Sequence, residues 1–446
     1  MTHYKEQVVK VGASHRQLRV NNGKVIDIFL NDVLFEAVEE GAIAQLVTGA
    51  SFPGVTRVVG TPDLHHGYIV PIGSVVETEG VLLPTAAGYD ISCGMCMIKT
   101  NLMREDVAST NKRRNWINHV SARVGLGLGR GRGEEGRKFT ERDIMRVIYE
   151  GRAFFGNRHI DCVERDSLPV DESIVGRPFE KALAKAIDQL GSLGSGNHFI
   201  EMQADQHDHV WIMLHTGSRG FGYAIADKYF KLGADVLNLA KGERDQVWMR
   251  DDSPLGQEYI NHHNAAANFA ICNRIVIAEA VIDALWDAFR GEGELHYEIS
   301  HNLIQEESGK LVHRKGATRA FPAGHPLLVG TKWEETGHPI LIPGSMETGS
   351  AILFARETAS QSIYSVNHGA GRKLARGEAR RQLNQTDANK KMHDLDILSN
   401  CRDIPLDECG ACYKDLCEVL KTVEEAGLAR VETRLDPIAN IKGDDK

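Results

Sequence analysis

The residues best suited to chemistry stand in a short segment rich in small side chains, residues 84–96 (Pro-Thr-Ala-Ala-Gly-Tyr-Asp-Ile-Ser-Cys-Gly-Met-Cys). Asp90 and Cys93 lie three residues apart, so one turn can aim a carboxylate and a thiolate at the same point. A thiolate can bridge two metal ions, and a neighbouring carboxylate adds an oxygen ligand and negative charge. Because two side chains cannot complete a metal site, further ligands must come from elsewhere in the chain.

Four later histidines share a setting that is typical of ligand positions. Each is flanked by Gly, Ser or Asn, and two of them follow apolar β-like runs, whose ends often carry ligands in α/β proteins. The four are His198, His215, His301 and His368. A lone histidine is more often an ordinary core or surface residue, and the chain has 19. The shared setting therefore carries the prediction that the chain folds to bring these segments to Asp90 and Cys93.

A second group of cysteines offers an alternative metal site. It comprises Cys401, Cys409, Cys412 and Cys417. Cys93-x-x-Cys96 could pair with Cys409-x-x-Cys412 around zinc, but no second Cys or His pair follows locally as in a zinc ribbon. We therefore disfavour a structural zinc site, and also a redox role for either pair.

Composition bounds the class of protein. The chain has 446 residues, 42% hydrophobic and 25% charged, with a net charge of −9. This length could hold two or three domains, but no linker divides it, so we expect one large domain over residues 1–446. The N-terminus lacks a secretory signal and we expect no run apolar enough to span a bilayer. A cytoplasmic protein without membrane contact follows, with its eight Cys reduced.

Charge and local pattern indicate an enzyme with a phosphorylated substrate. A net negative charge argues against a general nucleic-acid coat, while local basic clusters fit a groove for phosphate. Residues 101–170 form a basic, loop-rich, insertion-like region. Its glycine-rich basic loop, suited to a polyanion, carries Arg123, Arg130, Arg132, Arg137 and Lys138.

Hydrophobic spacing predicts strands and helices distributed along the whole chain. Asp63 and His65 would lie just past a short strand. Strands are expected at 55–59, 71–76, 210–214 and 296–299, with a last strand reaching Lys442. Helices are expected at 179–190, 223–241, 256–289 and 415–426, with a polar helix ending near 394.

Together the segments resemble the RtcB family of GTP-dependent RNA ligases over nearly the whole chain. The resemblance rests on Pro-Asp63-Leu-His-His-Gly-Tyr, Gly-Tyr-Asp90-Ile-Ser-Cys93-Gly, Gly-Ser-Gly-Asn197-His198-Phe-Ile-Glu201, His215-Thr-Gly-Ser-Arg219-Gly, Ser-His301-Asn302, Arg314-Lys-Gly-Ala-Thr, Pro-Gly-Ser345-Met and His368-Gly-Ala-Gly-Arg372. Two departures, Pro84-Thr-Ala-Ala-Gly in place of a glycine-richer run and Ser74 in place of Gly, indicate a divergent bacterial paralogue.

The resemblance implies a fold and an activity. The fold is α+β, a single large domain with mixed sheets surrounded by helices and a central metal and nucleotide cleft. RtcB proteins join an RNA 3′-phosphate or 2′,3′-cyclic phosphate end to a 5′-hydroxyl end, in RNA repair or tRNA splicing, with GTP and two Mn²⁺ ions. A histidine first takes GMP, the RNA 3′-phosphate then receives it, and the 5′-hydroxyl expels it. The expected partners are such RNA ends and an archease-like activator, and the expected state is a monomer or weak dimer.

The resemblance also implies residue roles. Cys93 would bridge two manganese ions, with Asp90 and His301 completing one site and His198 and His215 the other. His368 would carry GMP. Other catalytic positions are Cys93, Arg219, Arg372 and Asp63, and the guanylate positions are Asn197, Glu201, Ser345, Met346, Ser350, His368, Gly369, Gly371, Tyr413 and Lys442.

Alternatives remain at this point. Thiolate and imidazole ligands by themselves favour zinc, so manganese comes from the resemblance only. A dinuclear-metal phosphoesterase acting on RNA ends without nucleotide would need the metal ligands but not His368 or Ser345. A non-catalytic nucleic-acid-binding or zinc-stabilised protein would need neither, and the intact ligand set disfavours it.

Overall fold

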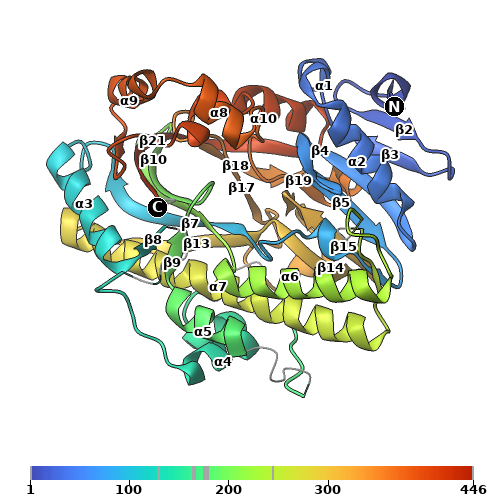
Figure 1. Cartoon of the computed structure of the whole chain (residues 1–446). Helices are drawn as coiled ribbons and strands as arrows, with labels where there is room; N and C mark the ends of the chain where they lie inside the picture. Colours follow the sequence, from blue (N-terminus) through green and yellow to red (C-terminus); the bar gives the residue numbers. More distant parts are fainter. Residues whose placement is uncertain are drawn as a thin grey trace.

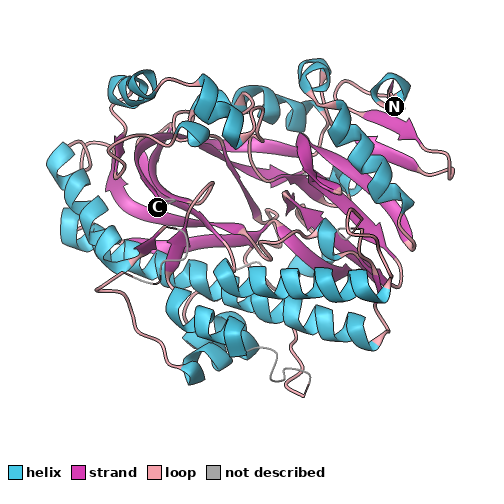
Figure 2. Ribbon diagram, in the orientation of Figure 1, coloured by secondary structure: helices cyan, strands magenta, loops and turns pink. Residues whose placement is uncertain are grey.

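The structure, a computed structural model, describes residues 3–127, 131, 133–162, 167–173, 180–243 and 246–443. Strands fill the middle of the molecule and helices cover both sides, which confirms the predicted α+β class (Figures 1 and 2). Arg130 and Arg132, and the first residue of the helix expected at 179–190, lie outside the described residues.

Within the described residues, one sheet has seven strands and is mixed, because β3 and β4 run parallel while the other neighbours are antiparallel. Helices α1 (Asp32–Ala37) and α2 (Glu40–Ser51) precede β4, and Leu46 of α2 belongs to the same buried cluster as Val58 and Val76. The strand order is β1 (Val9–Lys10), β2 (Arg16–Arg19), β3 (Val25–Ile28), β4 (Val55–Tyr68), β5 (Val70–Thr78), β15 (Lys310–Lys315) and β14 (Asn302–Glu307).

A second sheet, of eight strands in the described residues, positions the candidate site. Its order is β13 (Gly293–Ser300), β7 (Gly94–Met103), β11 (His209–Thr216), β10 (Phe199–Asp205), β21 (Ala429–Lys442), β18 (Ser350–Ala355) and β17 (Pro339–Pro343), with β20 (Leu398–Ser399) beside β21. Strand β7 lies between β11 and β13, and both pair with it antiparallel. Gly94 at the start of β7 faces Thr216 on one side and Ser300 on the other. The ends of β11 and β13 therefore meet the start of β7 at one edge.

Helices α6 (Arg219–Val236) and α7 (Pro254–Phe289) run side by side along one side of the sheets (Figure 1). Helices α3 (Thr110–Arg123) and α4 (Glu141–Glu150) pack against α7, and Trp116 and Ile144 are fully buried in the cluster that contains α7. The region 101–170, expected to be a loop-rich insertion, thus contains among its described residues two helices that pack on the core. Charged residues on the outer faces of α3 and α4 interrupt the apolar residues along the sequence, so the two helices were not predicted.

Helix α7 also corrects the expectation that no run could span a bilayer. By length and composition it could, since an 18-residue window has a mean hydropathy of 1.5 with 83% of that window buried inside the protein. Asn268, Asn273 and Arg274 interrupt the apolar run, and all three side chains are buried and hydrogen-bonded within the protein. The apolar residues of α7 thus serve the core of the fold.

Several boundaries differ from the sequence-based expectation. Strand β4 continues to Tyr68, with register shifts between Gly60 and His65, so Asp63 lies inside an irregular strand and not past its end. The polar helix is two helices, α8 (Arg376–Gln382) and α9 (Gln385–Asp394), because Asn384 caps α9 with its side chain. Helix α5 (Glu180–Gln189), helix α10 (Leu416–Glu425) and the end of β21 at Lys442 confirm the predicted elements.

Candidate active site

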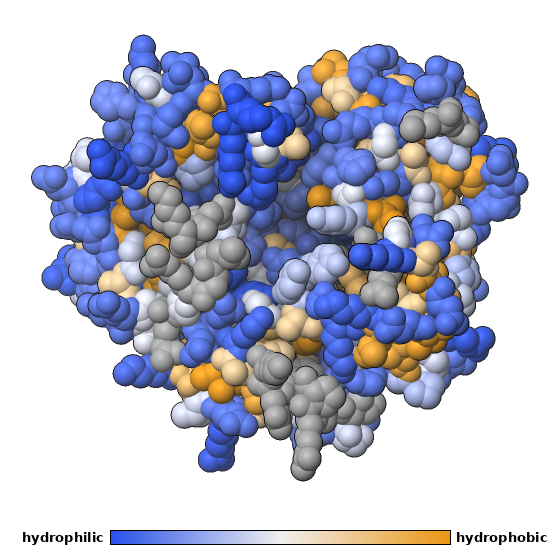
Figure 3. All heavy atoms as spheres, in the orientation of Figure 1, coloured by the Kyte–Doolittle hydropathy of each residue, from blue (hydrophilic) through white to orange (hydrophobic). Residues whose placement is uncertain are grey.

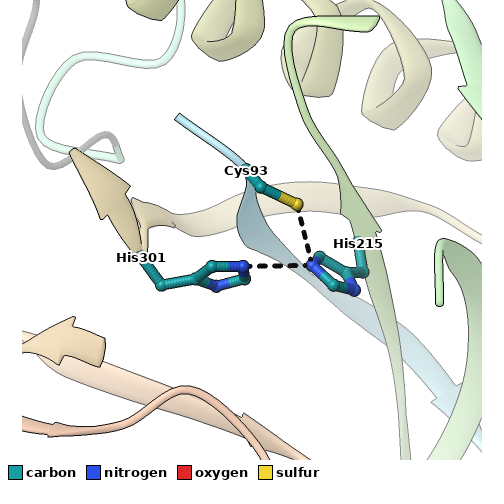
Figure 4. A group of neighbouring side chains, drawn as sticks. All are labelled: Cys93, His215 and His301. Atoms are coloured by element: carbon teal, nitrogen blue, oxygen red, sulfur yellow. Dashed lines mark hydrogen bonds between the residues drawn. The ribbon is translucent and has the colours of Figure 1, made fainter. Parts of the chain in front are cut away.

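Five side chains expected to bind metal converge at the edge where β7, β11 and β13 meet. Cys93 Sγ lies 3.1 Å from His215 Nε2 and 3.5 Å from His198 Nε2. His215 Nε2 lies 3.2 Å from His301 Nε2, and Figure 4 shows these rings and the thiol pointing to one place. Asp90 Oδ2 lies 3.1 Å from His198 Nε2. The segments therefore meet as the sequence analysis predicted.

The local backbone explains this convergence. His215 is the last residue but one of β11, and His301 follows β13 directly, so strand pairing with β7 places both beside Cys93. The backbone N–H of His301 donates to the carbonyl of Cys93 at 2.8 Å. Gly217 lets Asp90 approach, because a Cβ at Gly217 would lie 2.3 Å from Asp90 Oδ1.

The donor atoms fit a pair of cations. His198 Nδ1 faces the carbonyl of Leu193 at 2.9 Å and His215 Nδ1 faces that of Asn197 at 3.1 Å, so both rings carry their proton on Nδ1 and present a bare Nε2. Burial lowers the pKa of His215 and of His301 well below the usual value, which keeps these rings neutral. Bare nitrogens that face each other and a carboxylate repel unless a cation lies between them.

The acidic ligands support the same reading. Burial acts to raise the pKa of Asp90, but positive charge at His198 Nε2, which a metal ion can supply in place of a proton, lowers it to about 2, so Asp90 is an anion. Burial, reinforced by the charge of Asp90, raises the pKa of Cys93 well above its usual value. A thiolate at this position therefore needs a compensating cation.

The ligands divide into two groups that share Cys93. One comprises Cys93, His215 and His301, the other Asp90, Cys93 and His198, with the ligand atoms of each group within 4.8 Å of one another. The shared thiol fits the predicted bridge. This grouping differs from the expected division, which placed Asp90 with His301 and His198 with His215. Strand pairing brings His215 to His301, while the turn before β7 brings Asp90 to His198. Among the described residues, neither group contains Cys409 or Cys412.

A buried arginine braces the segments that carry three of these ligands. Arg274 of α7 donates to the backbone carbonyls of Ser92 at 2.5 Å and Thr216 at 2.9 Å, and to Ser300 Oγ at 3.0 Å. These residues adjoin Cys93, His215 and His301 in sequence. Arg274 also pairs with Glu298 of β13, and both side chains are fully buried. Nothing near Arg274 in the sequence suggested this role.

His368 lies next to the candidate metal ligands. Its ring lies 4.8 Å from that of His301, centroid to centroid. His368 Nδ1 lies 2.5 Å from Asp63 Oδ2, and Asp63 Oδ1 accepts from Thr61 Oγ1 at 2.7 Å. Asp63 is fully buried and, although burial opposes it, the charge of His368 lowers the pKa of Asp63. A carboxylate on Nδ1 leaves Nε2 as the reactive nitrogen.

Next to His368 lies a cavity of about 300 Å³. Every predicted guanylate position lines it: Asn197, Glu201, Ser345, Met346, Ser350, His368, Gly369, Gly371, Tyr413 and Lys442. Gly371 has φ +77°, and a Cβ there would lie 2.5 Å from the carbonyl of Asp63, so the turn after His368 requires glycine. Figure 3 shows that this face of the molecule is hollowed near its centre and that hydrophilic residues largely surround the hollow.

Glu408 is the principal cavity residue that the sequence analysis missed. Its buried carboxylate lies 3.1 Å from Lys442 Nζ, 2.9 Å from Arg376 Nη1 and 3.3 Å from Arg372 Nη1. Tyr413 donates its hydroxyl to Glu408 at 2.6 Å. Burial acts to raise the pKa of Glu408, but the charges of Lys442 and Arg376 lower it to about 2. The adjacent acidic residues Asp407 and Glu408, directly before Cys409, are the sequence feature that could have indicated this role.

The two arginines that were predicted as catalytic positions, Arg219 and Arg372, lie in different places. Arg372 lines the 300 Å³ cavity, and Glu408, the Asp407 carbonyl and Tyr413 hold its guanidinium. Arg219 and Asp90 line a different cavity, of about 490 Å³.

Glu201 differs from the other acids of the cavity. Burial raises its pKa to about 7, against the smaller opposing effects of the Gln203 hydrogen bond and the Lys442 charge. Gln203 also donates to Ser350 Oγ at 2.8 Å, which ties two cavity walls together. The floor of the cavity therefore offers a carboxyl group that changes charge near neutral pH.

Comparison with known proteins gives a consistent result along the chain. The sequence model of the RtcB family, described as tRNA-splicing ligase RtcB, matches residues 45–443. The tRNA-splicing ligase RtcB of Methanococcus maripaludis is 30% identical, over 98% of this chain and 100% of that protein. The tRNA-splicing ligase RtcB of Thermococcus kodakarensis is 33% identical, over 93% of this chain and 94% of that protein. The RNA-splicing ligase RtcB homolog 1 of Entamoeba dispar is 31% identical, over 93% of this chain and 86% of that protein.

Proposed function

Because the chain belongs to the RtcB family, we propose that it is an RNA ligase acting in tRNA splicing or RNA repair. It joins 3′-phosphate or 2′,3′-cyclic phosphate ends to 5′-hydroxyl ends with GTP and two Mn²⁺ ions, through a histidine–GMP intermediate. One observation carries the proposal. His368, oriented by Asp63, lines both the 300 Å³ cavity and a cavity of about 230 Å³ that contains Asp90, Cys93 and His301.

The first step follows from the position of His368. Its Nε2 attacks the α-phosphorus of GTP, a P–N bond forms, and pyrophosphate leaves. Asp63 keeps the Nδ1 proton in place and stabilises the positive charge that develops on the ring. Gly369 and Gly371 keep side chains away from the phosphate.

The second and third steps pass GMP onward. An oxygen of the RNA 3′-phosphate attacks the same phosphorus and the P–N bond breaks, which frees His368. The 5′-hydroxyl oxygen then attacks the RNA phosphorus, its proton goes to solvent or a nearby base, and GMP leaves. Mn²⁺ held by Cys93 and its neighbours would neutralise phosphate charge and polarise phosphoryl oxygens.

The cavity chemistry favours guanine as the base. Guanine presents N1–H and N2–H donors, which an ionised Glu201 carboxylate can accept, while Lys442 presents a donor for an oxygen acceptor. Adenine lacks this donor pair. Ser345 and Ser350 add hydroxyl groups around the nucleotide.

Covalent labelling tests the proposal. Protein incubated with Mn²⁺ and GTP labelled at the α-phosphate should acquire one acid-labile GMP, and ATP should label it far less. His368→Ala should abolish labelling, whereas His393→Ala, at a histidine 89% exposed on α9, should not. An adduct retained in His368→Ala would remove the nucleophile. Hydrolysis of RNA end phosphates without any nucleotide would favour the phosphoesterase instead.

The cytoplasmic location, the archease-like activator and the monomeric or weakly dimeric state stay predictions from the resemblance. Measuring ligation with and without an added activator, and molar mass by light scattering, would test the last two.

A further inference from the structure

Three tyrosines from different parts of the chain form an aromatic cluster beside Asp90, which we call the tyrosine stack. Tyr68 ends β4, Tyr89 directly precedes Asp90, and Tyr223 lies in the first turns of α6. The rings of Tyr89 and Tyr223 stack at 5.3 Å with an interplanar angle of 24°, and Tyr68 meets Tyr89 edge-on at 6.3 Å. Tyr223 is 53% exposed and Tyr68 is 68% exposed. Such exposed aromatic rings next to a reactive centre are suited to binding.

The tyrosine stack separates two cavities that both reach the metal ligands. Tyr89 and Asp90 line the cavity of about 490 Å³ together with Tyr223, Arg219 and Lys185, between α5 and α6. Tyr89 and Asp90 also line the cavity of about 230 Å³, whose other residues include His301, His368 and Lys315. Two separate approaches therefore converge on one carboxylate.

Ordinary packing accounts for only part of this arrangement. Tyr89 packs edge-on against Phe230 of α6 at 4.6 Å, which explains why its ring lies where it does. The same packing does not explain Tyr223, which covers Tyr89 with one face and is half exposed. Rings with exposed faces bordered by cationic side chains are the usual means of binding single-stranded nucleic acid, because bases stack on the rings and phosphates pair with the cations.

We propose that the tyrosine stack and the 490 Å³ cavity bind the terminal nucleotide of an RNA strand, with its base on Tyr223 and a phosphate near Arg219 and Lys185. The inference rests on the proposed ligase function, since ligation must bring two RNA ends to one centre. The 230 Å³ cavity then receives the other end. The terminal nucleotide belongs to either the 3′-phosphate or the 5′-hydroxyl strand, and the experiment distinguishes them.

The experiment measures binding of two short single-stranded RNAs to the full chain with Mn²⁺ and without GTP, so that no ligation occurs. One carries 2-aminopurine at a 3′-phosphate end and the other carries it at a 5′-hydroxyl end, because stacking on a ring quenches this base. Tyr223→Ala is compared with Tyr223→Phe, which keeps the ring. The matched control is Trp286→Ala, another ring that is 51% exposed on a helix. Phe221, two residues from Tyr223, contacts Phe269 of α7, and Trp286 lies 17 residues further along that helix. Trp286 is therefore about 25 Å from Phe269 and remote from the tyrosine stack.

The stacking model fixes the expected results. Tyr223→Ala should weaken binding of one of the two RNAs by about ten- to a hundred-fold and remove its quenching. Tyr223→Phe and Trp286→Ala should bind like the wild type. Lys185→Gln should reduce the slope of log K against log salt for the same RNA by about 0.7.

Other results would overturn the proposal. Unchanged binding of both RNAs by Tyr223→Ala would overturn it. If this variant binds both RNAs normally but loses binding to a protein partner, the tyrosine stack is a protein-docking surface. Weak binding by Tyr223→Phe would show that the hydroxyl and not the ring is used. Covalent GMP labelling, which needs no RNA, is measured on every variant as a check of folding. Absence of labelling in the wild type would reject the proposed function while leaving the RNA-binding result readable.

Discussion

Arg274 offers the sharpest test of how the fold holds the metal ligands. Its fully buried guanidinium contacts Ser92, Thr216 and Ser300, which adjoin three of the ligands, and pairs with Glu298. Ser92 has a left-handed backbone with φ 56°, a conformation that costs a non-glycine residue about 1–3 kcal/mol unless its surroundings impose it. The carbonyl of Ser92 is held by Arg274, so this contact fixes the turn that presents Cys93.

Substituting Arg274 should affect stability and metal binding through different contacts. Arg274→Met leaves the Glu298 carboxylate buried without its cation and should cost about 3–5 kcal/mol of unfolding free energy. It also frees the three ligand-bearing segments, which should weaken Mn²⁺ binding by about 10- to 100-fold, as expected for residues that orient metal ligands. Glu298→Gln is the matched control. It should destabilise the protein too, but bind Mn²⁺ nearly as well as the wild type, because the guanidinium keeps its contacts.

The double variant Arg274→Met/Glu298→Met separates the two effects. Removing both buried charges should restore most of the lost stability, while Mn²⁺ binding stays weak. Urea unfolding without metal measures the first quantity, and the electron paramagnetic resonance signal of free Mn²⁺ measures the second. Wild-type Mn²⁺ affinity in the double variant would refute the bracing role. Equal losses of affinity in Glu298→Gln and Arg274→Met would show that charge, not ligand placement, is responsible.

Three further predictions concern the acids around the nucleotide cavity. Asp63→Asn should slow GMP transfer to His368 by about 10²- to 10⁴-fold in single-turnover labelling, with little change in GTP binding, because the ring loses its orienting anion. Glu408, whose folded pKa is about 2, stabilises the protein above pH 4.5 and loses that contribution as pH falls toward 2. Urea unfolding should show a loss of about 3 kcal/mol in this window that is absent from Glu408→Gln. Because the pKa of Glu201 is about 7, its carboxyl group ionises as pH rises from 6 to 8, and the affinity for GTP should increase over this range. In a fluorescent-nucleotide titration, Glu201→Gln should flatten this dependence and lower the preference for GTP over ATP by about 10-fold or more.

The sequence predicted the ligand-bearing segments because their signals are local. Each candidate ligand lies in a turn or at a strand end and is flanked by small residues. These features can be recognised from the sequence alone. The grouping of the candidate metal ligands could not be predicted, because it depends on which strands flank β7. Asp63 was likewise expected just past a short strand, although β4 continues through it with a shifted register.

Residues that act through tertiary contacts were invisible for a different reason. Arg274 lies in an apolar helix that reads as core, and Glu408 lies among cysteines that drew attention to zinc. Their partners are 182 and 34 residues away in sequence, for Ser92 and Lys442 respectively. A buried charge predicts that a partner exists, since an unpaired one would be too costly, but no local pattern identifies it.

The same arrangement recurs at each part of the site. Asp63 holds His368, Glu298 holds Arg274 beneath the metal ligands, and Glu408 holds Lys442 and its neighbours. Replacing such pairs with apolar residues would often leave stability unchanged or raise it, so stability alone gives no reason for three of them. Under the proposed mechanism, each pair instead fixes part of the candidate site before the substrate arrives: the His368 ring, the backbone segments that Arg274 contacts, and the Lys442 ammonium group. Fixed charges reduce the reorganisation needed during phosphoryl transfer. The buried acids thus explain how side chains from distant segments can hold one reactive geometry.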